Sequence, residues 1–79
     1  MKLKYVRSRI GWVIFAPHIS HKSMIHSLEE TPTHAGFCSL SPRPDGGVVV
    51  SCWGESTSLG LAAGSDDSEW LTYKVNSYY

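Results

Sequence analysis

Three of the four histidines, His18, His21 and His26, lie close together in the sequence. Neutral imidazole is the commonest ligand of transition metals, so this group is the first candidate for chemistry. On a regular helix His21 and His26 diverge by about 140°, and His18 precedes the expected helix, so joint coordination would need a distorted helix start. We therefore expect surface or interface histidines and no metal site, with His18 and His21 as the remaining metal candidates.

The two cysteines, Cys38 and Cys52, are the next reactive side chains. They do not form a Cys-x-x-Cys pair, and two cysteines cannot build the disulfide-dense framework of small secreted domains. Free cysteine is usually buried and behaves as a small hydrophobe. We expect packed thiols, with a redox-sensitive pair as the alternative.

A Gly- and Ser-rich stretch at residues 54–60 follows an expected strand. A nucleophile elbow around Ser56 would need glycine two residues later, where Ser58 stands, and a phosphate-binding loop would need a Gly-Lys pair. No Lys or Arg lies between Arg43 and Lys74. The stretch therefore predicts a turn whose hydroxyls satisfy nearby backbone groups, and we expect no catalytic residue and no cofactor.

These side chains are positioned by a hairpin that the sequence marks clearly. Pro-Asp-Gly at residues 44–46 suits a three-residue hairpin turn, because Pro sets the first dihedral and Gly takes the left-handed third position. Pairing the strands around this turn places Cys38 opposite Cys52 and Leu40 opposite Val50. Both cysteines then share one face of the sheet.

Side chains alternate between the two faces of a strand, so the register assigns each residue of the hairpin to a face. The face expected to meet the core holds His34, Gly36, Cys38, Leu40, Val48, Val50 and Cys52. The opposite face holds Phe37, Val49 and Trp53, together with Ser39, Ser41 and Ser51.

The first part of the chain predicts a second hairpin followed by a helix. Residues 3–9 and 12–16 contain β-branched and aromatic residues typical of strands, and Pro17 ends the second of them. Ser20 can cap a short helix from residue 21 to about residue 30, whose apolar stripe would cover the sheet.

The last part predicts a loop and a final helix. Leu59 and Leu61 anchor the loop at residues 54–64, and Ser65 offers a helix cap. Acidic residues occupy the first helical turn, where the helix dipole favours them. The apolar-leaning stripe consists of Trp70, Leu71, Lys74, Val75 and Tyr78. We predict a single α+β domain spanning residues 1–79, of order ββαββα, in which two antiparallel hairpins form a sheet packed by one or two short helices.

Composition limits the class of protein. The chain has 79 residues, of which 42% are hydrophobic, and a formal net charge of zero. This content argues against intrinsic disorder. No apolar run reaches membrane-spanning length, and the first residues lack the apolar region of a signal peptide. We expect a cytoplasmic protein that does not bind membranes.

The charges are divided along the chain. Every acidic residue lies beyond residue 28, whereas five of the seven basic residues come before it: Lys2, Lys4, Arg7, Arg9 and Lys22. We expect a basic first strand at an edge of the sheet, where it could pair with a second copy in a homodimer. Two alternatives are an acidic protein partner and a nucleic acid.

The aromatic residues exceed what a small core readily buries. Trp and Tyr are favoured at protein interfaces because they bury a large area at low conformational cost. We therefore expect a partner-binding surface on one sheet face, the chain end and the basic strand, made of Trp53, Tyr78, Tyr79, Lys4, Arg7 and Arg9.

Residues 34 to about 71 resemble small, uncharacterised proteins encoded by bacteriophages and prophages. The resemblance lies in three motifs followed by an acidic cluster and a short final helix: Ala35-Gly36-Phe37, Gly54-Glu55-Ser56 and Ser58-Leu59-Gly60-Leu61. These motifs are structural, so they imply a setting, a bacterial host cytoplasm, and transfer no active site.

The sequence thus predicts a small non-enzymatic, phage-type protein that binds and modulates a host macromolecule, most readily a protein, as an inhibitor or adaptor. One alternative is a nucleic-acid-binding protein that uses the basic N-terminal strand. The other is a metal-dependent or hydrolytic enzyme that uses His18, His21 or Ser56.

Overall fold

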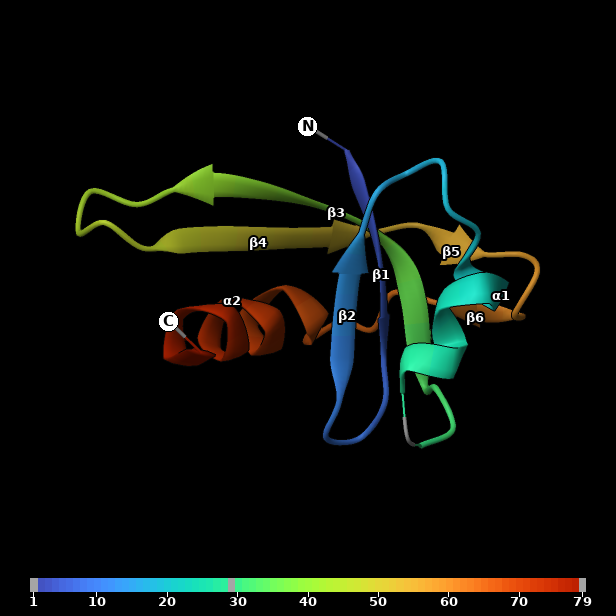
Figure 1. The fold of residues 1–79 in the computed structure, drawn as a ribbon. Helices are drawn as coiled ribbons and strands as arrows, with labels where there is room; N and C mark the ends of the chain where they lie inside the picture. Colours follow the sequence, from blue (N-terminus) through green and yellow to red (C-terminus); the bar gives the residue numbers. More distant parts are fainter. Residues whose placement is uncertain (1, 29, 79) are drawn as a thin grey trace.

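The computed structural model describes the backbone of residues 2–28 and 30–78, and it confirms the expected α+β class (Figure 1). An antiparallel four-stranded sheet is accompanied by a two-stranded sheet and two short helices. The elements in chain order are β1 (Leu3–Arg7), β2 (Trp12–Phe15), α1 (His21–Met24), the 3₁₀ turn η1 (Ile25–Ser27), β3 (His34–Pro42), β4 (Val48–Trp53), β5 (Glu55–Ser56), β6 (Leu61–Ala62) and α2 (Asp67–Tyr78).

The four strands of the main sheet follow the order β2-β1-β3-β4. β1 therefore lies in the middle, and the predicted edge position of the basic strand is wrong. The reason is that Tyr5 and Val6, which point to opposite faces, are both fully buried. Because β1 pairs with a strand on each side, it has no free edge at which the predicted pairing with a second copy of the chain could form.

The hairpin of β3 and β4 has the predicted register, with Cys38 opposite Cys52 and Leu40 opposite Val50. Gly46 has a φ of 92°, as its turn position requires, and its N–H donates to Arg43 O at 3.0 Å. β1 pairs with β3 only as far as Cys38, so the rest of the hairpin projects from the sheet (Figure 1). We call residues 39–51 the arm.

Both faces of the sheet are covered, rather than one. On the first face, Leu71 and Val75 of α2 pack on Tyr5, Cys38 and Val50. On the second face, α1, η1 and the 54–64 segment pack on a separate cluster of Val6, Phe15 and Ala35. Leu40, which was assigned to the core, is instead 41% exposed, because it lies in the arm beyond the ends of β1 and β2.

The first helix begins as predicted and ends early. Ser20 caps it, accepting a hydrogen bond from Ser23 N at 3.1 Å. The α-helix ends at Met24, one 3₁₀ turn follows, and Leu28 has extended backbone. Ile25 and Leu28 both pack on the second-face cluster. Tertiary packing therefore outweighs the local helical pattern, which predicted that the helix would continue to about residue 30. Glu29 lies outside the described residues.

The segment at residues 54–64 is more ordered than the predicted loop. Glu55 pairs with Ala62 and Ser56 with Leu61, which forms the two-stranded sheet of β5 and β6. Leu59 and Leu61 pack against the second-face cluster as predicted.

The helix α2 covers the outer edge of β4 with polar side chains. Backbone N–H groups of alternate β4 residues donate to α2 oxygens four residues apart. Four helical residues rise about 6 Å and two strand residues about 6.7 Å, so the repeats match. This edge ladder consists of Cys52 N to Ser68 Oγ at 2.8 Å, Val50 N to Thr72 Oγ1 at 2.8 Å and Val48 N to Asn76 Oδ1 at 2.9 Å. Within the described residues, no helix is long and apolar enough to cross a membrane.

Candidate functional site

The predicted partner-binding residues do not form one surface. Trp53 is 43% exposed at the end of β4, and Arg9 is exposed in the turn between β1 and β2. Lys4 is half-buried and donates from Nζ to Ile19 O at 3.0 Å. The end of α2 lies beside Val48, at the opposite end of β4 from Trp53. The side chain of Tyr78, and Tyr79, lie outside the described residues.

Arg7 was predicted to lie on the partner-binding surface, but the structure places it in the interior. It is buried, its Nη1 lies 2.7 Å from Asp67 Oδ1, and its guanidinium carbon lies 3.7 Å from the centre of the Trp70 ring. A guanidinium stacks favourably on an aromatic face and pairs well with a carboxylate. The central position of β1 therefore turns a predicted surface charge into an internal ion pair.

Asp67 is the centre of a buried polar cluster that the sequence did not reveal. Its carboxylate accepts hydrogen bonds from the Tyr5 hydroxyl, from Arg7 and from Gly64 N, the last at 2.9 Å. His34 Nδ1 lies 3.7 Å from Oδ1. Burial, and then the hydrogen bond to Asp67, hold the pKa of the Tyr5 hydroxyl well above its usual value. We call these residues, with Trp70, the Asp67 cluster.

The Asp67 cluster joins β1, β3 and α2, and the Asp67 carboxylate accepts the hydrogen bonds that its neighbours donate. Tyr5 and Asp67 are fully buried, so no substrate reaches them in this conformation. In the part of the chain that the structure describes, Arg7 Nε is the buried side-chain polar atom without a hydrogen-bond partner. Arg7 and Asp67 are 60 residues apart, and the only local signal was an acidic first helical turn, which the helix dipole already explains.

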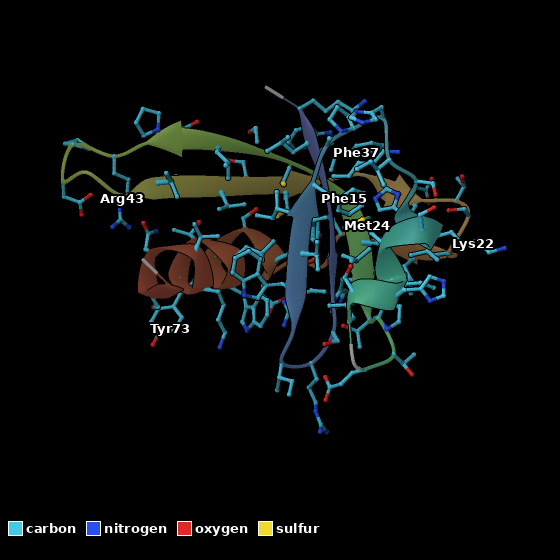
Figure 2. The ribbon with its side chains drawn as sticks, in the orientation of Figure 1. Phe15, Lys22, Met24, Phe37, Arg43 and Tyr73 are labelled. Carbon is cyan, nitrogen blue, oxygen red and sulfur yellow. The ribbon has the colours of Figure 1, made fainter. Side chains whose placement is uncertain are left out.

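The histidines do not gather. His21 is buried, whereas a surface or interface position was expected, and its Nε2 lies 2.8 Å from Gly36 O. Its ring meets Phe15 and Phe37 edge-on, with centroids 5.6 and 5.9 Å away. Figure 2 shows Phe15 and Phe37 close to α1. His18 and His26 are exposed. Across residues 2–28 and 30–78, no three His, Cys, Asp or Glu side chains lie close enough to hold a metal ion.

The cysteines form the predicted cross-strand pair and are free thiols. Cys38 is fully buried and Cys52 half-buried. Burial, and then the neighbouring Cys52, raise the pKa of Cys38 to about 12. Burial, and then the charge of Asp67, raise the pKa of Cys52 to about 11. Both thiols therefore stay protonated at neutral pH, and the thiolate is the nucleophilic form.

We expect iodoacetamide to alkylate the native protein at pH 8 about 100-fold more slowly than the urea-unfolded chain, because an unperturbed thiol has a pKa near 8.5. The native rate should rise about tenfold per pH unit between pH 8 and 10, since both raised pKa values lie above this range. Mass spectrometry over time measures both rates. Equal rates for the folded and unfolded chains would contradict buried, protonated thiols.

Ser56, the candidate nucleophile of the hydrolytic alternative, is buried in β5. Its Oγ lies 3.3 Å from Ser58 Oγ. This contact fits a hydroxyl that is satisfied locally.

A groove lies between β2, the arm and the last turns of α2. It has a volume of about 700 Å³, and its end is formed by four residues of the turn, Arg43, Asp45, Gly46 and Gly47. Figure 1 shows the three elements that form its walls. Arg43, at the arm's far end in Figure 2, pairs with Asp45, Nε to Oδ1, at 3.0 Å. The walls of this β2 groove are Trp12 and Ile14 from β2, Leu40 and Val48 from the arm, and Val75 and Asn76 from α2.

Comparisons of the chain with protein-family models, with curated proteins and with solved structures find no match. Its function must therefore be inferred from the geometry. The β2 groove is concave, largely apolar and accessible, whereas the Asp67 cluster is closed. Sequence reasoning missed the groove because it assigned Leu40 and Val48 to a core, and a strand pattern alone does not distinguish a core face from a groove wall.

Proposed function

We propose that this chain is a non-enzymatic protein that binds a partner protein through the β2 groove and modulates it, as an inhibitor or adaptor. The observation that supports this function is the groove itself, in which apolar side chains from three elements meet around the 41% exposed Leu40. Concave apolar surface with a few polar groups is typical of binding sites. The resemblance to small phage proteins adds a setting to the proposal, in which the partner is a bacterial host protein.

The nucleic-acid alternative has less support. Lys2 and Arg9 flank opposite ends of β1, whose five residues span about 17 Å. Between them, Arg7 is neutralised by Asp67. Proteins that bind nucleic acids use a continuous basic surface, because affinity depends on neutralising several phosphates together.

We expect Leu40→Glu to weaken partner binding at least tenfold, because it places an unpaired carboxylate in an apolar contact. The matched control is Val49→Glu, since Val49 is a neighbouring arm residue, 39% exposed, that does not line the groove. Each variant is immobilised, and proteins retained from a bacterial host lysate are quantified by mass spectrometry.

A protein retained by the wild type and by Val49→Glu, and lost with Leu40→Glu, would support the proposal. If no retained protein depends on Leu40, or if both variants lose the same protein equally, the proposal is wrong. Both residues are substantially exposed, so we expect both variants to fold. Equal melting temperatures of the two variants would check this.

A further inference from the structure

We infer that the β2 groove takes an extended, uncharged, apolar segment of the partner, which pairs with β2 as a fifth strand of the sheet. The inference rests on the proposed function and defines the chemistry of the partner. It follows from the two edges of the sheet, from the residues of β2 and from the shape of the groove.

The two edges of the sheet differ. The outer N–H groups of β4 are occupied by the edge ladder from α2. At the other edge, the hydrogen bond from Ser8 N to Gly11 O, at 2.8 Å, shows which residues of β2 hydrogen-bond to β1, because hydrogen-bonded and non-hydrogen-bonded pairs alternate along an antiparallel pair of strands. Gly11 and Val13 are therefore at hydrogen-bonded pair positions, and Ile14, the residue after Val13, directs its N–H and C=O away from β1. Within residues 2–28 and 30–78, β2 pairs with no other strand, and Ile14 borders the groove.

β2 lacks the residues that usually protect an edge strand. Edge strands usually carry Lys, Pro or a bulge, which discourage the addition of another strand. The sequence of β2 is Trp-Val-Ile-Phe, with neither charge nor proline. An extended peptide that pairs with such an edge gains affinity from main-chain hydrogen bonds and specificity from alternate side chains. Here those side chains would contact Leu40 and Val75 across the groove.

A peptide segment fits the groove better than a second copy of the chain. β2 spans four residues, about 13 Å, whereas a stable dimer buries about 800 Å² on each partner. The arm and α2 flank the edge of β2, so the body of a second copy would meet them first (Figure 1). Arg43 and Asp45 pair with each other at the groove end. Because the groove offers no net charge, it complements an uncharged segment.

The test selects nine-residue peptides from a random ribosome-displayed library on the immobilised wild-type chain, with Leu40→Glu used to remove non-groove binders. We expect selected sequences to be rich in β-branched residues and to lack proline and charge. Alternate amides of a bound peptide face β2, and N-methylation of these amides should weaken binding at least tenfold, because it removes their hydrogen bonds to the sheet. A peptide that is N-methylated at the other amides, which face solvent, should bind as before, because those amides make no hydrogen bond to the sheet.

Amide exchange identifies the edge directly. With a selected peptide bound, the Ile14 amide should exchange at least tenfold more slowly. The Val13 amide, which already faces β1, is the internal control and should change little. An unchanged Ile14 amide, binding that is insensitive to the N-methylation register, helical periodicity in the selected peptides, or no selected peptide would each overturn the inference.

Two further outcomes separate this inference from the proposed function. If a lysate protein depends on Leu40 and leaves the Ile14 amide unprotected in its complex, the proposed function stands and strand addition is wrong. If the chain itself dimerises at micromolar concentration by light scattering, and Leu40→Glu abolishes the dimer, the occupant is a second copy and the inference is overturned.

Discussion

Replacing Asp67 by alanine is expected to lower the free energy of unfolding by about 3–5 kcal/mol. Asp67 is fully buried and accepts hydrogen bonds from Tyr5, Arg7 and Gly64 N. Its removal leaves the buried Arg7 guanidinium without its close partner. The cost of an uncompensated buried charge exceeds the net contribution of the intact pair, because both groups have already lost their hydration.

Urea unfolding followed by circular dichroism measures this effect, and Asp66→Ala is the matched control. Asp66 is the adjacent carboxylate, 69% exposed and 3.8 Å from Arg7 Nη1, so its removal should change the free energy of unfolding by less than about 1 kcal/mol. A chain of 79 residues has a total stability of about 4–12 kcal/mol, so Asp67→Ala could unfold it.

Two milder variants therefore accompany Asp67→Ala. Tyr5→Phe removes one hydrogen bond to the carboxylate and should cost about 1–3 kcal/mol. The double variant Arg7→Met with Asp67→Leu removes both charges and should be more stable than Asp67→Ala alone. If the double variant is less stable than the single one, or if Asp66→Ala costs as much as Asp67→Ala, the buried pair does not have the proposed role.

The parts of the fold that sequence reasoning predicted correctly depend on local rules. The register of β3 and β4 follows from one turn and the two-residue alternation of a strand, so Cys38 and Cys52 were placed opposite each other correctly. The Ser20 cap and the packing of Leu59 and Leu61 also follow from local signals.

The parts that were wrong depend on the order of strands. No local signal places β1 between β2 and β3, and this position is what buries Arg7 against Asp67. The projection of the arm also depends on where β1 ends its pairing with β3. That projection exposes Leu40 and opens the β2 groove, so the candidate site appears only when three separate elements are assembled.

The Asp67 cluster and the edge ladder are mechanically related. Asp67 fixes the first turn of α2 to β1, and the ladder fixes the following turns along β4. Each contact places the helix where the other can form. Together they hold Val75 and Asn76 as one wall of the β2 groove, so damage to either is expected to widen the groove as well as to destabilise the fold.

The edge ladder also determines which side of the sheet is available for pairing. We expect the triple variant Ser68→Ala, Thr72→Val and Asn76→Ala to lose about 2–4 kcal/mol of unfolding free energy, because three part-buried N–H groups of β4 lose their acceptors. The uncharged Val-Val-Val run of β4 would then become a second open edge.

The triple variant is therefore expected to self-associate as well as to unfold more easily. Sedimentation velocity at increasing concentration, together with urea unfolding, measures both effects. The control is the alanine triple variant of Glu69, Tyr73 and Ser77, which have the same four-residue spacing on the exposed side of α2. Because these side chains make no ladder contact, the control should resemble the wild type in stability and association. A ladder variant that is as stable as the control, and that sediments no faster, would mean that water replaces the α2 side chains at β4 without opening the edge.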